Sequence, residues 1–278
     1  MRASSLSVSI VSFDPDLALL AAALSSLAAS IRQAQAGGQL GDASVTVLDN
    51  GPQDRFFLRL KELAGCAFAD VPGVRAAVLA TGANLGYGAA NNISIRASEA
   101  DYHLVLNPDV ILAGDAIAEA MRYMESHRET VLLSPLATGS DGERQYLCKH
   151  PPGLWTLFLR GFAPAFVRRH FGRPLRQYEM RAETGDGDYA GHFLASGCFM
   201  FMRGDALRAS GGFNPAYFMY FEDYDLSLRL ARQGTLAFVP EVKIVHHGGG
   251  AATKGWRHRL WFLRSALRFF NSHGWRLV

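Results

Sequence analysis

The chain has 278 residues, of which 49% are hydrophobic and 19% are charged. Such a composition provides ample material for a packed core and excludes a mainly disordered protein. Lys and Arg number 28 against 25 Asp and Glu, so the net charge of +3 is too balanced for a general nucleic-acid binder. The sequence therefore predicts a soluble globular protein of one large domain or two small ones.

Cysteine usage and the apolar segments bear on the compartment. The three cysteines, Cys66, Cys148 and Cys198, are odd in number and widely spaced, which fits a reducing compartment better than a disulfide framework or a zinc cluster. The apolar segment Leu17–Ile31 lacks the basic region that precedes the core of a signal peptide. No stretch reaches the ~18 consecutive apolar residues of a membrane span. We expect a cytoplasmic protein.

The first 134 residues alternate between strand and helix patterns, with turn signals such as Asp49-Asn50-Gly51-Pro52 between them. This alternation predicts an α/β fold, with a parallel sheet that helices cover on both faces. In chain order, the expected segments are a strand at Leu6–Phe13, a helix at Asp16–Gln35, a strand at Ser44–Leu48, a short helix at Pro52–Leu63, a strand at Val74–Ala80, a helix ending near Ala97, a strand at Tyr102–Leu106, a helix at Asp115–Ser126 and a strand at Thr130–Ser134.

Polar residues follow several of these strands. Asp14, Asp49, Asn84 and the segment Asn107–Asp109 all come directly after apolar runs. Right-handed crossovers would bring these strand ends to one edge of the sheet. Because ligands of such sheets bind outside the carboxyl ends of the strands, we expect the functional site at this edge.

The second half of the chain is less regular. Pro135–Gly191 is predicted to be rich in loops, and no internal repeat or long linker separates independent domains. The expected elements that follow are a strand at Phe193–Met202, a helix at Glu222–Arg232, short strands at Thr235–Val239 and Val242–Val245, and a helical tail from Gly255.

One glycine-rich segment resembles the start of a phosphate-binding loop. Gly86-Tyr87-Gly88-Ala89-Ala90-Asn91 begins like a dinucleotide fingerprint, but Asn91 stands at the third glycine and no convincing acidic residue follows about 20 positions on. A nicotinamide-binding fold is therefore disfavoured. The sequence also contains neither a GxxxxGK[ST] loop nor a GxSxG nucleophile elbow.

Asp109 is a candidate metal ligand. It lies just past an apolar strand, after Pro108, which restricts the backbone of the turn. Asp-x-Asp pairs elsewhere in the chain are weak signals, since they occur at a helix start and in a polar turn. The alternative for Asp109 is a simple N-cap of the helix that follows.

His246-His247 ends a strand and precedes three glycines. Most histidine pairs are structural or exposed, but a glycine loop lets the backbone approach a phosphate closely. An imidazole beside Asp109 would complete a mixed nitrogen and oxygen metal site. Separately, the aromatic run Phe218–Phe221 leads into Glu222 and Asp223 at a helix start, a setting that suits a general base at the rim of an apolar wall.

An ordered set of segments resembles family 2 glycosyltransferases, most closely the rhamnosyltransferase-like branch that builds bacterial surface polysaccharides such as the O-antigen of lipopolysaccharide. The segments are VSIVSF, VLDNGP, NLGYGAANN, LNPD, SGCFMFMRGDALRASGGFNPAYFMYFEDYDLSLRL and HHGG, over about residues 6–250. Single segments are weak, but their order and spacing are highly specific. The resemblance implies a GT-A fold: a Rossmann-like, mostly parallel sheet flanked by helices, with an irregular acceptor-binding second half.

The resemblance also implies residue roles. Asp223 would be the catalytic base with Glu222 holding the acceptor, while Asp109 and His246 would bind a divalent cation, Mg²⁺ or Mn²⁺, or the diphosphate. The nucleotide sugar would be held by Val11, Ser12 and Phe13 at the nucleoside, Asp49 at the pyrimidine base, and Asn84, Gly86, Asn91, Asn92 and Asn107 around the nucleotide and sugar. The chain departs from the usual family residues at Asp14, Pro52 and Asn214, and at Ala251-Ala252, where a Ser is frequent.

These observations predict a single GT-A domain with a nucleotide-sugar half at 1–109, an acceptor and catalytic half at 110–253 and a basic helix at 254–278. The expected enzyme inverts the anomeric carbon and moves a sugar, favoured to be rhamnose from dTDP-rhamnose, onto a hydroxyl of a saccharide or lipid-linked glycan. The alternatives are a UDP-hexose donor, a nucleotidyltransferase, which the acidic segment Asp14–Asp16 disfavours, and a non-catalytic sugar-nucleotide binding module.

The tail Lys254–Val278 contains six cations and no acid. At helical spacing, one face carries Trp256, Leu260, Leu263, Leu267 and Phe270, and another carries Arg257, Arg264 and Arg268. Two readings stay open: a terminal helix docked on the sheet, or an interfacial helix that makes peripheral contact with the cytoplasmic face of the inner membrane.

Overall fold

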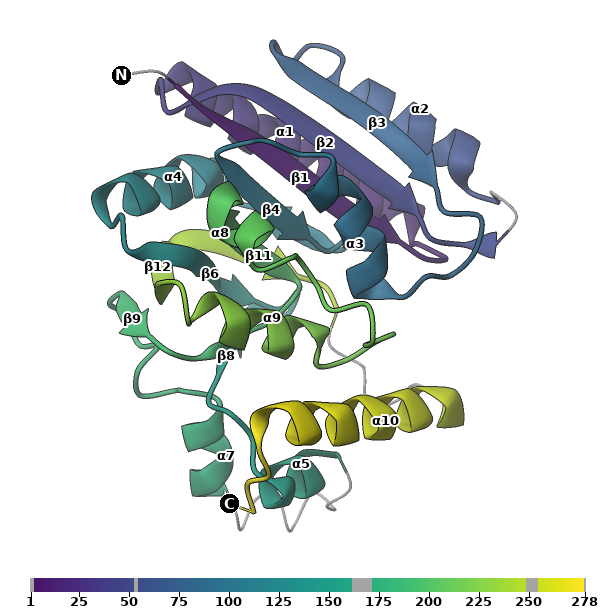
Figure 1. Cartoon of the computed structure of the whole chain (residues 1–278). Helices are drawn as coiled ribbons and strands as arrows, with labels where there is room; N and C mark the ends of the chain where they lie inside the picture. The colour runs from purple at the N-terminus through teal and green to yellow at the C-terminus, as the bar shows by residue number, and fades with distance from the viewer. Residues whose placement is uncertain (1–2, 53–54, 162–171, 249–254, 278) are drawn as a thin grey trace.

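A computed structural model of the chain describes residues 3–52, 55–161, 172–248 and 255–277 (Figure 1). Within these residues, a ten-stranded sheet has the order β3-β2-β1-β4-β11-β6-β12-β5, with β7 on β6 and β9 on β12. The strands are β1 Ser4–Ser12, β2 Leu40–Asp49, β3 Val74–Ala80, β4 Tyr102–Leu106, β5 Val110–Leu112, β6 Thr130–Thr138, β7 Arg144–Gln145, β8 Cys148–Lys149, β9 Tyr189–Gly191, β10 Leu194–Ala195, β11 Phe199–Arg203 and β12 Thr235–His246. β8 and β10 form a separate two-stranded sheet.

The main sheet is mostly parallel, as predicted. β1 pairs in parallel with β2 and β4, and β2 does so with β3. β12 is also parallel to β6. Four strands run the other way: β11 is antiparallel to β4 and β6, β5 and β9 are antiparallel to β12, and β7 is antiparallel to β6. The carboxyl ends of β1, β2 and β4 therefore share one edge of the sheet, which is the edge where the sequence places the functional site.

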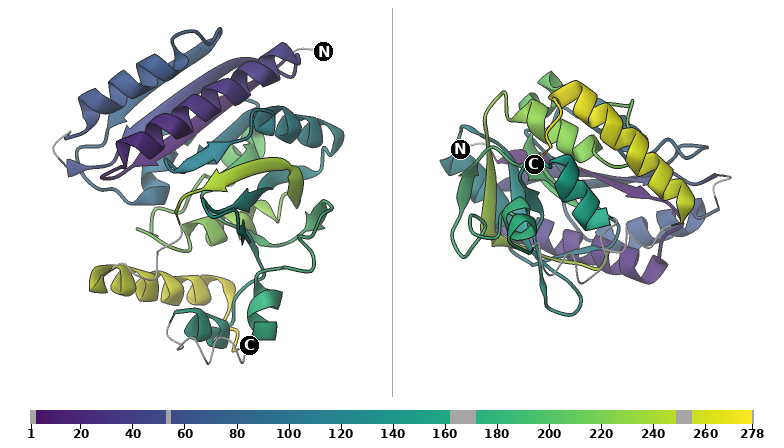
Figure 2. Two further views of the ribbon diagram at one scale, coloured as in Figure 1. Left: turned by 180° about the vertical axis from the view of Figure 1, so that it is seen from behind. Right: turned by 90° about the horizontal axis from the view of Figure 1, so that it is seen from below.

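Helices cover both faces of the sheet (Figures 1 and 2). α1, α2 and α4 contribute to the large core on one face, and α3, α8 and α9 contribute to the core on the other. The helices are α1 Leu17–Ala36, α2 Phe57–Phe68, α3 Tyr87–Arg96, α4 Ala116–Ser126, α5 Leu154–Gly161, α7 Gly172–Tyr178, α8 Gly204–Ala209, α9 Glu222–Leu230 and α10 Trp256–His273.

α1 begins where the acidic segment predicted a helix start. The Asp16 carboxylate accepts hydrogen bonds from the backbone N–H groups of Ala18 and Leu19, which are otherwise unsatisfied in the first turn. By length and composition, α1 is the one helix among the described residues that could cross a membrane. Its Leu20, Ala23, Leu24, Leu27 and Ile31, at helical spacing, are buried in the core.

Three expectations about the elements were wrong in detail. The strand expected at Phe193–Met202 is two short strands, β10 and β11, separated by Ser196-Gly197-Cys198. The two strands expected near the end are one, β12, with a shift in its pairing to β6 between Val239 and Lys243. The region expected to be loop-rich contains α5 and α7. Ala251-Ala252, where the chain departs from the usual family residues, and Lys254 at the start of the tail lie outside the described residues.

α10 and α5 lie together at one end of the molecule, away from β3 (Figures 1 and 2). Leu157 of α5 and Phe269 and Phe270 of α10 form a small core with Tyr217 and Phe221. The segment after α10 pairs with the start of α5, since Leu154 N–H donates to Arg276 O at 2.9 Å and Trp155 N–H donates to Leu277 O at 3.2 Å. We call α5 together with residues 255–277 the C-terminal lobe.

Candidate active site

The donor side of the candidate site lies at the ends of β1 and β2. Two buried oxygens there have no hydrogen-bond partner among the described residues: Ser12 Oγ and Asp49 Oδ2. The other Asp49 oxygen accepts from Gly51 N–H at 3.2 Å. Phe13, just beyond β1, is 54% exposed. Because buried polar atoms are nearly always satisfied, these oxygens suit a ligand that brings its own N–H or O–H groups.

A hydrogen-bond network centred on Asn50 shapes the loop that leads into α3. Its Oδ1 accepts from Leu85 N–H at 3.0 Å and from the Thr81 hydroxyl at 3.2 Å, and its amide donates to Asn84 Oδ1 at 3.2 Å. Asn84 Oδ1 also accepts from Gly86 N–H at 2.9 Å. The site prediction included Asn84 and Gly86 but missed Asn50, which holds both in place.

Asn91, Asn92 and Val11 make their contacts inside the protein. Asn91 is buried and accepts from the Ser9 hydroxyl at 2.7 Å, while Asn92 is buried and exchanges hydrogen bonds of 2.7 and 2.8 Å with the backbone of Phe213. Val11 packs in a small apolar cluster inside the sheet edge. These three side chains face the interior because one side of α3 and one face of β1 must pack against the protein. The two asparagines thereby tie α3 to β1 and to the Phe213 backbone.

Gly86 connects two segments. One is the loop between β3 and α3, which we call the donor loop, and the other is the turn Phe218–Phe221 before α9, which we call the catalytic turn because the predicted base follows it. The Gly86 φ of +84° favours glycine, and a Cβ there would clash with the carbonyl oxygen of Phe218. The next residue, Tyr87, donates its backbone N–H to the same oxygen at 3.2 Å. A glycine at this position therefore allows two segments far apart in the sequence to touch.

Asp109 and His246 lie next to each other at the end of the sheet. Asp109 Oδ1 is buried without a hydrogen-bond partner among the described residues, and it lies 3.7 Å from His246 Nε2. The His247 backbone N–H donates to the Asp109 carbonyl at 3.0 Å. Of the two histidines, the geometry therefore brings the His246 side chain to Asp109. Asn107, two residues before Asp109, donates its backbone N–H to Cys198 O at 2.9 Å.

Gln145 holds the His246 ring. The Gln145 side-chain oxygen lies 2.8 Å from His246 Nδ1, and its amide nitrogen donates to the His246 carbonyl at 2.9 Å. A proton on Nδ1 leaves a lone pair on Nε2, toward Asp109. Burial lowers the pKa of His246, although the Asp109 charge acts in the opposite direction. A neutral imidazole facing a carboxylate oxygen is a pair of electron donors that a cation can bridge.

Gly248 keeps space open beside this pair. A Cβ at Gly248 would lie 2.5 Å from Asp109 Oδ2 and 2.9 Å from His246 Nε2. The described residues hold no cluster of three or more His, Cys, Asp or Glu side chains that could bind a metal. Two protein ligands fit Mg²⁺ or Mn²⁺, because such ions are commonly held by one or two side chains together with substrate phosphates. The residues present therefore fit a divalent cation that arrives with a diphosphate.

The catalytic turn leads into α9. Tyr220 and Phe221, just before the helix, have φ values of +69° and +65°. This left-handed conformation is strained for bulky side chains, and such strain concentrates at functional sites. Asp223 follows in the first turn of α9, where its carboxylate accepts from Gly197 N–H and from Tyr224 N–H, each at 2.9 Å. The Asp223 carboxylate is thus held in one orientation while remaining partly exposed.

Glu222 differs from its neighbour. It is buried, and its Oε2 has no hydrogen-bond partner among the described residues. Burial, and next the charge of Asp223, raise the pKa of Glu222 well above its usual value. Adjacent carboxyl groups in different environments can divide the roles of acid and base. Here the partly exposed Asp223 suits a base, and Glu222 suits a neutral group that donates a hydrogen bond.

The segment Gly197-Cys198 joins the parts of the site. Gly197 N–H holds Asp223, and Gly197 O accepts from the Tyr87 hydroxyl at 2.6 Å. Burial raises the pKa of the Cys198 thiol to about 12, and the charges of both Asp109 and Asp223 contribute. The Asp109 and Asp223 carboxylates therefore flank one short segment. The sequence-based prediction did not include Tyr87, Gly197 or Gln145. Of these three, only Gly197 was marked by a sequence signal, because it interrupts the apolar run Phe193–Met202.

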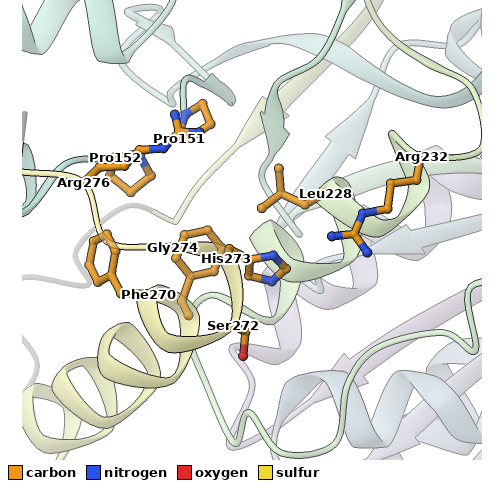
Figure 3. A pocket seen from close by; sticks show the side chains of 10 residues that line it. Pro151, Pro152, Leu228, Arg232, Phe270, Ser272, His273, Gly274 and Arg276 are labelled. Atoms are coloured by element: carbon orange, nitrogen blue, oxygen red, sulfur yellow. The ribbon is translucent and has the colours of Figure 1, made fainter.

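Asp225, the third acid of the run, has a structural role. It is buried and pairs with Arg229 at 2.8 Å and with His273 of α10 at 2.8 Å. A cavity of about 260 Å³ lies beside His273 (Figure 3). It is lined by Pro151, Pro152, Leu228, Arg232, Phe269, Phe270, Ser272, His273, Gly274 and Arg276. None of the predicted site residues lines it.

The fold and the site define the class of protein. The structure is similar to the mannosyltransferase PcManGT from Pyrobaculum calidifontis in complex with GDP-Man and Mn²⁺, with a TM-score of 0.60, 15% identity and coverage of 95% of this chain and 61% of that chain. It is also similar to S. aureus TarS 1–349 in complex with UDP-GlcNAc, with a TM-score of 0.58, 11% identity and coverage of 96% and 67%. These likenesses show the GT-A fold.

The sequence comparisons show the family. Residues 60–260 match the model of "Glycosyltransferase like family 2", and the chain belongs to this family. It is 31% identical over 216 residues to an N-acetylglucosaminyl-diphospho-decaprenol L-rhamnosyltransferase of Mycobacterium tuberculosis, covering 73% of this chain and 66% of the relative, slightly less than two thirds of its length. It is 29% identical over 204 residues to the rhamnosyltransferase WbbL of Escherichia coli, covering 68% and 71%.

Proposed function

We propose that the protein is an inverting glycosyltransferase that moves rhamnose from dTDP-rhamnose onto a hydroxyl of a lipid-linked glycan. The observation that carries this proposal is the arrangement around Gly197-Cys198, which Asp223 and Asp109 flank. One carboxylate is oriented by two backbone N–H groups, and the other faces a neutral imidazole next to an open glycine. A transferase needs these two functions, a base for the acceptor and a charge partner for the leaving diphosphate.

In the proposed step, an acceptor hydroxyl loses its proton to the Asp223 carboxylate as its oxygen attacks the anomeric carbon. The bond from that carbon to the diphosphate oxygen breaks in line, and the nucleoside diphosphate leaves with the bonding electrons. A single displacement of this kind inverts the anomeric configuration. Glu222 would donate a hydrogen bond to the acceptor, since burial raises its pKa and thereby favours the protonated carboxyl. General-base catalysis of this type contributes ~10²–10⁴ in rate.

Asp109 and His246 would hold a divalent cation, which supplies positive charge to the leaving diphosphate. Gln145 orients the imidazole for this role, as groups behind metal ligands commonly do. Gly248 leaves room for the phosphate oxygens beside both side chains. Ser12, Asp49 and Phe13 would receive the nucleoside, through two unpartnered oxygens and one exposed aromatic ring.

The choice of donor and acceptor is supported by the names of two relatives. Both are rhamnosyltransferases, and the name of one states an acceptor on diphospho-decaprenol. We also propose that the reaction takes place in the cytoplasm, because free thiols such as those of the three cysteines persist there. A UDP-hexose donor is the alternative within the family. A nucleotidyltransferase is disfavoured because Asp16 caps α1 where that reaction needs a basic phosphate loop.

A panel of nucleotide sugars tests the proposal. We expect dTDP-rhamnose with Mg²⁺ or Mn²⁺ to raise the melting temperature most, and incubation with a short-chain lipid-diphospho-N-acetylglucosamine to give a product of inverted anomeric configuration. A larger rise in melting temperature with a UDP-hexose would assign a UDP-hexose as the donor instead. Release of pyrophosphate from a nucleoside triphosphate and a sugar phosphate would favour the nucleotidyltransferase. No shift with any nucleotide sugar would contradict the proposal.

A further inference from the structure

Exposed apolar side chains are concentrated on the C-terminal lobe. Among the described residues, 14 large hydrophobic side chains are exposed, and nine of them belong to this lobe. They are Leu154, Trp155, Phe158, Trp256, Leu260, Leu263, Leu267, Trp275 and Leu277. Single exposed apolar residues need no explanation, but a contiguous group marks a surface that contacts something apolar.

α10 has two apolar faces. Its inner face packs against the aromatic run before α9, and Ala266, Phe269 and Phe270 are buried there. The outer face carries Trp256, Leu260, Leu263 and Leu267 at steps of four, three and four, the spacing of one helical stripe. These four side chains are 72%, 56%, 48% and 54% exposed. Packing in the core therefore explains the apolar residues of the inner face of α10 but not those of its outer face. α10 is docked on the protein, but against α5 and the aromatic run and not on the sheet as one of the two alternatives expected. The predicted apolar stripe lies outside, apart from Phe270.

α5 adds to the same end of the molecule, which Figure 2 shows from below with α5 and α10 nearest the viewer. Its Leu157 packs inward while Leu154, Trp155 and Phe158 are 36%, 41% and 48% exposed, and the rings of the last two stack at 5.5 Å. The lobe thus presents two helices and the C-terminal segment, each with an outer apolar side.

The charges are segregated along the sequence. Residues 144–178 and 242–278, which include both helices of the lobe, contain 14 of the 28 Lys and Arg and none of the 25 Asp and Glu. These segments therefore carry a formal charge of +14, and the remaining residues carry −11, from 14 cations and 25 acids. Arg257, Arg259, Arg264 and Arg268 of α10 are exposed beside the outer stripe.

We propose that the C-terminal lobe docks on the surface of an anionic bilayer, with the outer stripe of α10 and the exposed side chains of α5 in the interface. Apolar residues with Trp and flanking Arg are the composition of interfacial helices. Each cation near an anionic surface favours binding by about fivefold. A second copy of this chain fits poorly, because an isologous contact would bring two such positive surfaces together without any acid.

Docking at this face would place the catalytic turn near the membrane. The inner face of α10 holds that turn directly: the Ser265 hydroxyl donates to Met219 O at 2.8 Å, and Tyr220 and His258 are hydrogen-bonded at 2.9 Å. The Phe218 and Trp261 rings are 4.8 Å apart. A lipid-linked acceptor would then reach Asp223 from the bilayer. This consequence rests on the proposed function, whereas the docking rests on the surface alone.

The test uses the full chain and sedimentation with vesicles of phosphatidylcholine alone or mixed with phosphatidylglycerol, at low and high salt. We expect binding only to the anionic vesicles, with release by salt. The variant R257Q/R264Q/R268Q should bind about 100-fold more weakly, from the product of three fivefold factors. The matched control R32Q/R75Q/R128Q removes the same charge from three exposed arginines outside the lobe and should bind normally.

A second pair of variants separates the apolar contribution. L260Q/L263Q/L267Q should lose binding to anionic vesicles, and L58Q/L79Q, at exposed leucines elsewhere, should keep it. Both α10 variants should retain the donor-induced thermal shift and transfer to a soluble short-chain acceptor, and lose transfer only to an acceptor embedded in vesicles. Loss of the thermal shift in the wild-type chain would overturn the proposed function without touching the docking.

Three outcomes would overturn the docking proposal. The intact chain could fail to bind anionic vesicles, or all four variants could bind equally. Alternatively, light scattering could show a concentration-dependent dimer that L260Q/L263Q/L267Q abolishes, which would assign the outer stripe to a second copy of the chain.

Discussion

The donor edge and the catalytic turn lie on the same side of one sheet, but different means hold them in place. The donor edge follows directly from parallel strands, and its loop is ordered by Asn50, which bonds to groups within about 35 residues of itself. The catalytic turn contains two left-handed residues and is held by Gly86 from one side and by α10 from the other. The donor edge is held by contacts between neighbouring strands and their loops, while the catalytic turn is held by contacts with segments much farther away in the sequence.

This difference has a consequence for variants. A change at the donor edge should alter ligand binding and leave the fold intact, because each polar group there is either satisfied locally or left open for a ligand. A change in the contacts behind the catalytic turn should alter stability and turnover together.

The first prediction compares the two adjacent carboxyl groups. Asp223→Asn should reduce turnover by ~10²–10⁴ and keep donor binding, because the amide cannot take the acceptor proton. Glu222→Gln should lose much less, since a neutral carboxyl and an amide can both donate a hydrogen bond. The measurement is the rate of transfer at saturating donor, with the donor-induced thermal shift as the control. Near-normal turnover of Asp223→Asn would reject it as the base.

The raised pKa of Glu222 also predicts the sign of a stability effect. The folded state retains a proton on Glu222 at a pH where the unfolded state has lost it, so this residue costs stability as pH rises above about 4.5. Glu222→Gln should therefore be more stable than the wild type at neutral pH, and equal to it in acid. Urea unfolding at both pH values measures this difference.

The second prediction concerns the link between α9 and α10. Asp225→Ala leaves Arg229 and His273 partly buried without their shared carboxylate, and breaking a buried pair in this way costs about 3 kcal/mol. Turnover should fall as well, because α10 supports the catalytic turn. Urea unfolding gives the stability, with Asp186→Ala at an exposed turn as the matched control. An unchanged free energy of unfolding would show that the turn holds without α10.

The third prediction tests the buried polar group behind the donor edge. Burial lowers the pKa of His103 to about 3, so the unfolded chain binds a proton on this residue between that value and about 6.5 while the folded chain does not. Stability should therefore fall as pH decreases below 6.5, by roughly 1.4 kcal/mol per unit and about 2 kcal/mol by pH 5.

The control for this effect is a second histidine. His103→Gln should remove that slope from the difference in unfolding free energy between pH 5 and pH 7. His192→Gln, at an exposed position, should keep the slope. If both variants show the wild-type slope, His103 is not neutral in the folded state.

The fourth prediction addresses the cation site. Gly248→Ala introduces a methyl group 2.5 Å from Asp109 Oδ2 and 2.9 Å from His246 Nε2, so both side chains must move. Disturbing ligand orientation in this way weakens metal affinity by about 10- to 100-fold. Asp109→Ala should weaken metal-dependent donor binding at least as much. Gly187→Ala, where a Cβ would have open space, is the matched control. Unchanged dependence on Mg²⁺ or Mn²⁺ in Asp109→Ala would contradict the assignment.

The sequence by itself determined the framework of this protein. The bounds of β3 and β4 agree with those read from the apolar runs, and Asp16 caps α1 as the acidic segment indicated. Asp109 follows β4 and Asp223 lies in the first turn of α9, as the sequence indicated, because a strand end and a helix start are local features. Periodicity and turn signals suffice for such assignments, since they act over a few residues.

Only the tertiary structure decided which side chains meet. Nothing near Asn91 in the sequence shows that it accepts a hydrogen bond from the Ser9 hydroxyl in the core. Likewise, nothing near Gly197 shows that Asp223 and Tyr87 converge on its backbone. The outer face of α10 is another case, because the helical pattern gives two apolar faces and only the packing shows which one is covered. Contacts between distant segments depend on how buried surfaces and hydrogen bonds are satisfied together over the whole chain, and short-range patterns do not contain that information.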